Sequence, residues 1–252
     1  MKQPIFRMFF LFPLFHVIYL NVLLSEENIL LHVIGGIIVF FIMHNFGPSI
    51  GYHKLFAHSA FVPRTFYPYL SVYISMLCFV GGPLGYTIIH SLHHKYADTE
   101  MDPHAPNRGR FRAYMGWMLT FKLKEIPKMV LKLRKQYPWM PYVENWDVMI
   151  LCLSYFSLYM ISSSLFLCVL LGGLLSGHLN GLVNAFAHRN EGELNGSDLS
   201  LDRPFLAKYL NQVFNHRNHH VNLQNYDSTT PDATDGQVFF IKNLLQKDDK
   251  NN

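Results

Sequence analysis

Long apolar runs alternate with short polar segments along the chain. A helix needs about 20 apolar residues to cross a bilayer. Runs without Asp, Glu, Lys or Arg predict four membrane-spanning helices, at about 8–24, 29–52, 148–161 and 165–187. The polar segments 25–28 and 162–164 are the expected turns within two helical hairpins. The pattern therefore predicts an all-α integral membrane protein, organised as a single domain over 1–252.

The first apolar run also fits a second interpretation. Lys2 and Arg7 precede it, as basic residues precede the apolar part of a secretory signal peptide. However, no small-residue cleavage site stands before Glu26, and another apolar run follows directly. We therefore favour a hairpin.

A fifth uncharged run, 66–89, lies between two groups of histidines at 53–58 and 90–94. If it crossed the bilayer, the two groups would lie on opposite faces and could not share a site. We therefore expect a non-spanning, re-entrant segment. Gly81-Gly82-Pro83 and Gly85 are the expected bend, because Pro removes a helical donor and Gly permits otherwise strained dihedral angles.

The polar segments 90–146 and 188–252 are expected to form a helical cap on the cytosolic side. With four spans, the two exterior turns carry Glu26 and Glu27, and all 21 Lys and Arg residues fall on the opposite side. The positive-inside rule makes that side cytosolic, in a bacterial inner membrane or the endoplasmic reticulum. Within the cap, 111–137 is expected to be an amphipathic, interfacial segment interrupted at Pro127, and its basic residues fit either a solvated face or an anionic ligand.

Composition supports a lipid environment, since 50% of the residues are apolar and only 15% are charged. The net charge of +4 does not indicate nucleic acid, because the basic residues lie between apolar runs instead of in one patch. The three cysteines lie inside apolar runs, where thiols pack as small hydrophobic groups.

The histidines carry the candidate chemistry. His90, His93 and His94 have the i, i+3, i+4 spacing that stacks side chains on one helix face, so we expect three imidazoles to converge on one point. The same spacing recurs at 216, 219 and 220, and His188 follows Asn184 by four residues. His53 and His58 lie about 140° apart on an α-helix. They would reach two different metals, or their helix would unwind.

The number of histidines indicates two metal ions, because no single ion accepts so many ligands. Two metal ions with four or five imidazole nitrogens each would account for all of the clustered histidines. Asn184 could add an oxygen directly or through water. Imidazole suits Zn, Cu, Fe and Ni alike, but a zinc hydrolase normally keeps three protein ligands. A redox pair that activates O2 explains the number better. The candidate ligands are His53, His58, His90, His93, His94, His188, His216, His219 and His220.

The motifs around these histidines resemble those of the membrane fatty acid desaturases, in particular the acyl-CoA type that introduces a double bond near the middle of a saturated chain (stearoyl-CoA delta-9 desaturase-like). The matching stretches are GYHKLFAH at 51–58, HSLHHKYADTEMDPH at 90–104, RGRF at 108–111, GW at 116–117, NAFAH at 184–188 and HRNHH at 216–220. The resemblance implies two iron ions, which with O2 and two electrons remove two hydrogens from adjacent methylenes of a long acyl chain.

The resemblance also implies further roles. Asp98, Glu100, Asp102 and Asp227 are candidates for orienting the ligand imidazoles, with surface ion pairs as the alternative. Trp117 is a candidate substrate contact. Ile37 and Phe41 are candidates for the closed end of an acyl tunnel, or ordinary lipid-facing residues. Electrons are expected from a separate donor, either a cytochrome b-type haem protein or a ferredoxin with its reductase.

The sequence departs from the family pattern beside the last histidine motif. QVFN at 212–215 replaces the usual Gly-Glu, and VNL at 221–223 replaces an aromatic-Pro pair. The acyl carrier therefore stays open among CoA, phospholipid and acyl carrier protein. A fatty-acyl hydroxylase on the same irons is an alternative activity. A metal transporter is a more remote one, for which His178 would be the main polar residue within a span.

Overall fold

The computed structural model describes residues 6–189, 198–231 and 234–247. These residues form helices joined by loops, and their only β interactions are isolated bridges such as His188 with Ser200. The expected all-α class is therefore confirmed.

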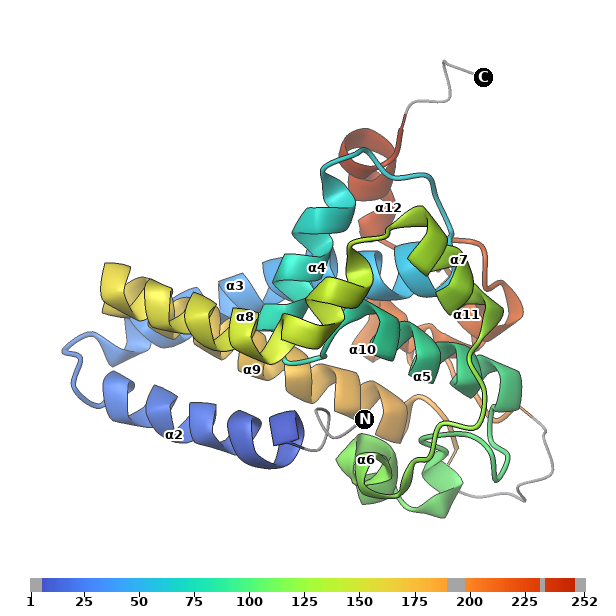
Figure 1. The fold of residues 1–252 in the computed structure, drawn as a ribbon, viewed down its shortest axis with the longest axis horizontal. Coiled ribbons are helices and arrows are strands. Elements are labelled where there is room, and N and C mark those ends of the chain that lie inside the picture. Colours follow the sequence, from blue (N-terminus) through green and yellow to red (C-terminus); the bar gives the residue numbers. More distant parts are fainter. Residues whose placement is uncertain (1–5, 190–197, 232–233, 248–252) are drawn as a thin grey trace.

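The longest helices lie side by side in one elongated bundle (Figure 1). A π-helix, η1, leads into α2, and a second π-helix, η2, directly continues α3. Two stretches of the described chain are long and apolar enough to cross a membrane, Ile29–Ala57 and Ser163–Phe186, and Arg7–Leu23 is a shorter apolar helix. Four crossings therefore stay a prediction. The helices of the bundle are η1 (Arg7–Leu11), α2 (Phe12–Leu23), α3 (Ile29–His44), η2 (Asn45–Ala57), α8 (Met140–Ile161) and α9 (Ser163–Phe186).

The turn at 162–164 is where the sequence places it. Helix α8 ends at Ile161, and the Ser162 side chain accepts a hydrogen bond from the Leu165 N–H, which caps the start of α9. Helix α8 begins at Met140, however, eight residues before the apolar run at 148. Its first turns carry Glu144 and Asp147, and Asp147 is paired with the buried Arg7.

Close packing between α3 and α9 depends on glycine. A Cβ on Gly36 would overlap the Leu171 side chain, and a Cβ on Gly172 would press on the backbone of Phe40. The bundle core is continuous with this contact and includes Phe12, Phe79, Tyr155 and Leu170.

The apolar run 66–89 is broken in the middle, as the expected bend requires. Helix α4 (Tyr67–Leu77) ends before Gly81, which has φ of +91°, and α5 (Pro83–Tyr96) begins with Pro83. Both oxygens of Glu144 accept hydrogen bonds from the first turn of α5, at 2.9 Å from Leu84 N and 3.1 Å from Gly85 N. The carboxylate thereby caps the helix that carries three of the candidate ligands.

The remaining elements form a cap at one end of the bundle (Figure 1). The expected amphipathic segment 111–137 is divided into η4, α6, an extended stretch and α7, whose Val130 and Leu133 are buried. A buried ion pair joins Lys54 Nζ to Asp235 at 2.6 Å and ties the C-terminal part to η2. The cap elements are η3 (Pro106–Arg108), η4 (Arg112–Gly116), α6 (Trp117–Thr120), α7 (Lys128–Gln136), α10 (Pro204–Tyr209), η5 (Gln212–Phe214), α11 (His216–Val221), α12 (Gln237–Phe240) and η6 (Ile241–Leu245).

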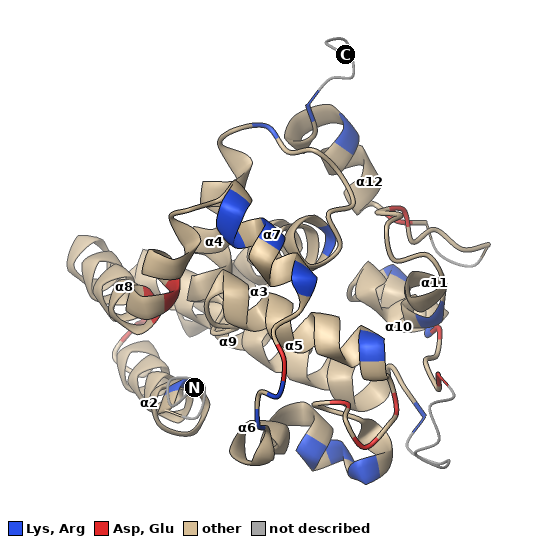
Figure 2. Cartoon of the chain, turned by 45° about the vertical axis from the view of Figure 1, so that its right-hand side comes forward, with Lys and Arg blue, Asp and Glu red and all other residues tan. Residues whose placement is uncertain are grey.

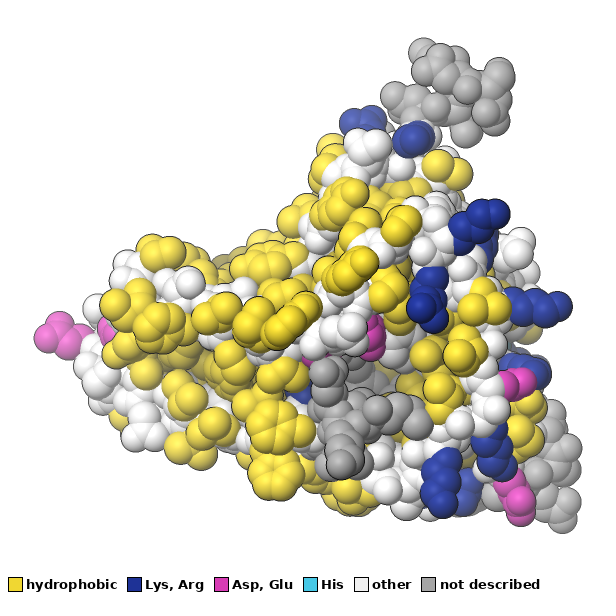
Figure 3. Space-filling model, viewed as in Figure 1, with side chains coloured by type: hydrophobic (Ala, Val, Ile, Leu, Met, Phe, Trp, Pro, Cys, Tyr) yellow, Lys and Arg dark blue, Asp and Glu magenta, His cyan; other side chains and the backbone are white. Residues whose placement is uncertain are grey.

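Charge follows this division. Lys and Arg gather on the cap (Figure 2), whereas the visible face of the bundle is covered largely by hydrophobic side chains (Figure 3). An apolar outer surface next to a basic end is the pattern expected of a protein inserted in a bilayer.

Candidate metal centre

The nine candidate histidines meet in two groups at the junction of bundle and cap. In each group, one nitrogen from every imidazole lies within 4.8 Å of the others. The five-histidine cluster contains His53, His58, His90, His94 and His219. The four-histidine cluster contains His93, His188, His216 and His220.

The structure corrects one expectation, that each closely spaced triplet converges on a single point. On α5, His90 and His94 join the five-histidine cluster, while His93 turns to the other. Residues at i and i+4 lie nearly above one another, whereas the residue at i+3 is rotated towards the opposite side of that line. Helix α11 divides in the same way, sending His219 to one cluster and His216 and His220 to the other. Each short helix therefore serves both clusters.

A π-helix brings His53 and His58 together. Over Asn45–Ala57 the backbone has the wider π-helical turn, and the His58 N–H donates to the His53 carbonyl at 3.2 Å. This i to i+5 bond stacks residues five apart, so the two ring centroids are 4.9 Å apart. The α-helical geometry assumed from the sequence would have separated them. Helix η2 packs tightly on α4, where a Cβ on Gly51 would overlap the Ser71 side chain.

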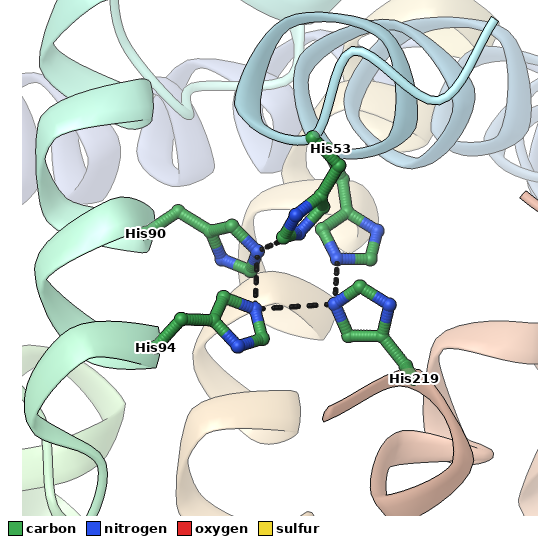
Figure 4. Close-up of side chains that lie close together, drawn as sticks. His53, His90, His94 and His219 are labelled. Carbon is green, nitrogen blue, oxygen red and sulfur yellow. Dashed lines mark hydrogen bonds between the residues drawn. The ribbon is translucent and has the colours of Figure 1, made fainter. Parts of the chain in front are cut away.

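The Nε2 atoms of the five-histidine cluster point at one another across short distances (Figure 4). They are 2.9 Å apart for His53 and His219, 2.7 Å for His58 and His90, 2.9 Å for His90 and His94, and 3.1 Å for His94 and His219. In the four-histidine cluster, His216 Nε2 lies 3.0 Å from His188 Nε2 and 3.1 Å from His220 Nε2.

Carboxylates set the orientation of three imidazoles in the four-histidine cluster. His188 Nδ1 lies 2.7 Å from Asp98, His220 Nδ1 lies 2.9 Å from Asp198, and His93 Nδ1 lies 3.0 and 3.1 Å from the two oxygens of Asp102. Because a carboxylate only accepts, each Nδ1 carries the proton, and each Nε2 presents its lone pair to the centre.

Facing lone pairs need a cation between them. Protons could supply the charge, but burial and the neighbouring His188 hold the pKa of His93 well below its usual range, and burial and His220 do the same for the pKa of His216. A metal ion satisfies several lone pairs at once and prefers neutral imidazole. The donor set therefore fits two metal ions, one in each cluster.

The predicted carboxylates fall into two groups. Asp98 and Asp102 are buried and contact candidate ligands. Glu100 is exposed, and Asp227 is partly exposed in a loop, where it accepts from the Thr229 N–H. Sequence reasoning missed Asp198, which stands in a polar stretch outside the matched motifs. A carboxylate ten residues beyond His188 was the available signal, and it is too weak to find without the fold.

His104 adds a tenth imidazole beside the centre. It is 4% exposed, its ring centroid is 4.4 Å from that of His93, and its Nδ1 has no hydrogen-bond partner. His93, Asp102 and His104 also form a possible three-ligand group. The sequence shows this residue within the Asp-Pro-His stretch at 102–104 but does not distinguish it as a separate candidate.

An apolar cavity of about 460 Å³ opens beside the clusters. His90 and Asn184 belong to its wall, and both also line a smaller cavity of about 40 Å³ that reaches His53, His93 and His216. The large cavity runs between α5, α9 and the η4–α6 segment, and its lining includes Phe79, Ile88, Ile89, Trp117, Met118 and Phe121.

The predicted substrate residues are placed differently from one another. Trp117 lines the large cavity. Ile37 and Phe41 lie on the outer side of α3, 43% and 39% exposed, and neither lines it. The reason is the packing of α3, because Gly36 and Phe40 face α9 and turn positions 37 and 41 outward. Their placement matches the lipid-facing alternative.

We expect the metal-free protein to lose stability as pH falls below about 6.5, the ordinary pKa of histidine. Burial lowers the pKa of His58 and of His104 to about 3. Above pH 6.5 both states are neutral. Below pH 6.5, these histidines are protonated in the unfolded chain but stay neutral in the folded one. Each of them therefore lowers the free energy of unfolding by about 1.4 kcal/mol per pH unit. Thermal unfolding measured between about pH 7.5 and pH 5 tests this, and a flat profile would contradict it.

Fold and site together define a class: an all-helical protein with helices of membrane-spanning length, whose paired histidine clusters border an apolar cavity. No protein-family model matches the chain. It is 32% identical over 112 residues to the acyl-CoA Delta(11) desaturase of Trichoplusia ni, covering 39% of this chain and 32% of that protein. It is 28% identical over 184 residues to the acyl-CoA C20 Delta5-desaturase of Anemone leveillei, covering 69% and 58%.

A third relative is the sn-1 stearoyl-lipid 9-desaturase of Anabaena variabilis, 30% identical over 84 residues, covering 33% of this chain and 31% of that protein. These matches support the resemblance of the chain to the membrane fatty acid desaturases. Each match spans less than two thirds of its relative's length.

Proposed function

We propose that this protein is an oxidoreductase that desaturates a long-chain fatty acyl group with O2 at a histidine-ligated pair of iron ions. The observation that carries the proposal is the meeting of two imidazole clusters with one apolar cavity through shared wall residues, His90 and Asn184. Within this function we propose an acyl-CoA substrate and the delta-9 position, following the motif resemblance. The relatives act on acyl-CoA and on acyl-lipid substrates at several positions, so this finer choice rests on the resemblance alone.

The nine clustered histidines would hold the two irons, with Asn184 contributing directly or through water. When bound, the irons with O2 supply the oxidising power needed to remove hydrogen from an unactivated methylene, which acid–base groups cannot do. The protein's own contribution is positional. Asp98, Asp102 and Asp198 orient the imidazoles, and the cavity excludes water and holds the chain beside them.

We further propose a multi-pass topology with four spans and the cap on the cytosolic side, in a bacterial inner membrane or the endoplasmic reticulum. The apolar bundle surface and the basic cap support this arrangement. It requires α4 and α5 to stay on the cap side, and the break between Leu77 and Pro83 supports that course.

The basic side of the cap is the proposed docking surface for an anionic partner. That partner is the acyl carrier or a separate electron donor, such as a cytochrome b-type haem protein or a ferredoxin with its reductase. Exposed cations extend over the end of η3, the loop before η4, the extended stretch and α7. They are Arg108, Arg110, Lys122, Lys124, Lys128, Lys132, Arg134 and Lys135.

The test is expression in a cell that cannot make unsaturated fatty acids, followed by mass spectrometry that locates any new double bond. We expect a monounsaturated product that depends on O2. An alcohol without an alkene would show a hydroxylase instead. Metal uptake into vesicles without oxygen-dependent oxidation would show a transporter. A double bond elsewhere than position nine would retain the desaturase but reject the delta-9 proposal.

A further inference from the structure

A second group of hydrogen-bonded polar side chains lies in the bundle, apart from the metal clusters. It joins three elements: His16 on α2, His178 on α9 and Tyr114 on η4. The Nε2 atoms of His16 and His178 are 3.0 Å apart, and the Tyr114 hydroxyl is bonded to His178 Nδ1. His16 Nδ1 lies 2.7 Å from the backbone oxygen of Phe12. Polar side chains within membrane helices are costly unless paired, so such a group needs an explanation.

The bonds have one consistent direction when both imidazoles are neutral. The Phe12 carbonyl only accepts, so His16 carries its proton on Nδ1 and presents a lone pair at Nε2. His178 must then donate from Nε2, which leaves its Nδ1 as an acceptor. The Tyr114 hydroxyl is therefore the donor to His178. Each of the four ring nitrogens and the tyrosine hydroxyl then makes one hydrogen bond.

This series of hydrogen bonds ends at the wall of the large cavity. Tyr114, Gly177 and Gly181 all line it, so the residues on either side of His178 along α9 belong to the same wall. The Tyr114 ring lies directly on Gly181, where an added Cβ would overlap ring carbons. Its ring is also parallel to that of His178, at an interplanar angle of 2°. The tyrosine is thus held by a hydrogen bond at its tip and by close packing along its face.

Tyr114 also controls the segment that follows it. Helix η4 continues without a break into α6, whose Trp117 and Met118 line the cavity. The hydroxyl of Tyr114 therefore connects this side of the cavity wall to α9 and, through His178, to α2. Losing that bond would let the wall move while leaving the metal clusters intact.

We propose that Tyr114, His178 and His16 form a positioning device that sets the width of the cavity and so selects which acyl chains fit. The inference rests on the proposed function, because it assumes that the cavity holds an acyl chain. Tyr114 contacts the acyl chain directly, whereas His178 and His16 act on it by holding Tyr114 in place. None of the three belongs to either metal cluster.

The experiment measures binding of palmitoyl-CoA and stearoyl-CoA to the purified full chain, and the ratio of the two affinities is the readout. Tyr114→Phe removes only the hydroxyl and should change this ratio by about tenfold, the scale at which an apolar pocket senses a methylene. His16→Leu, outside the cavity wall, should shift the ratio in the same direction. Tyr73→Phe is the matched control, because Tyr73 also joins two helices, through Ser154 at 3.2 Å, but does not line the cavity.

A Tyr114→Phe protein that keeps the wild-type ratio of affinities would overturn the inference. The proposed function is judged separately, by the double bond that the wild type makes in cells. Selective binding without a product would reject the function and leave the positioning device. Nitrogen NMR of labelled histidine gives a readout independent of activity, and we expect His178 protonated on Nε2 in the wild type. A proton on its Nδ1 would contradict the assigned direction of the bonds.

Discussion

Replacing His93 by Ala is expected to abolish the unsaturated product and to lower the iron content from about two ions per chain to about one, since each cluster fits one ion. His93 is 2% exposed and belongs to the four-histidine cluster, where its ring centroid lies 4.8 Å from that of His188 and 5.2 Å from that of His220. Removing it takes one of four ligands from that cluster and leaves all five ligands of the other. A two-metal reaction cannot proceed on the remaining ion.

The matched control is His32→Ala. His32 is also buried, but it lies in the first turn of α3, where its ring nitrogens bond to Asn28 O at 2.9 Å and to Ser164 at 3.0 Å. This variant should retain the product and both ions. Metal analysis and product analysis on the same preparations make the comparison. Persistent turnover in the His93 variant would show that the ligand assignment is wrong.

Changing Asp98 to Asn is expected to weaken metal binding by roughly 10- to 100-fold, the usual effect of removing a carboxylate that orients a ligand imidazole. Asp98 holds the proton of His188 on Nδ1 and is itself fixed by the Leu199 N–H at 2.8 Å. The same Asp98 oxygen accepts from both donors, so the amide oxygen of Asn would take its place and keep both bonds. Without the negative charge the bond to Nδ1 is weaker, so the imidazole keeps its orientation but becomes a poorer metal ligand.

Glu100→Gln is the control for this variant. Glu100 is two residues from Asp98 and loses the same charge, but it is exposed and lies outside the candidate ligand groups. Competition with a chelator measures the affinity of each protein. Equal affinities in the two variants would contradict the role given to Asp98. We expect Asp198→Asn to have an intermediate effect, because the Asp198 side chain is 43% exposed and water can replace it.

The local arrangement of the ligands could be predicted to the extent that helical spacing controls it. The i, i+4 pairs on α5 and α11 do point to the same cluster, as their spacing requires. The i+3 members do not, because each of these helices lies between the two clusters and uses both of its sides. Spacing along one helix does not reveal which elements pack against each of its sides. The division of the histidines between two clusters therefore could not be predicted from the sequence.

The geometry of the first histidine pair, His53 and His58, could not be predicted for a different reason. In α-helical geometry His53 and His58 diverge, which predicts either two different metals or an unwound helix. The π-helix over Asn45–Ala57 adds one residue to the hydrogen-bonded turn and aligns them. Its stability comes from packing against α4 and α5, with Tyr52 and Phe56 fully buried. Tertiary contacts of this kind have no local signature in the residues of the turn.

The order of apolar runs, the bend at 81–83 and the set of histidines followed from residue chemistry, because burial, backbone freedom and metal affinity are properties of single residues and short spacings. The division of the ligands, the carboxylate of Asp198 and the cavity wall around Tyr114 arise where helices distant in sequence meet. Their geometry depends on how the side chains of α5, α9 and the cap fill the same space, and residue order alone does not specify that contact.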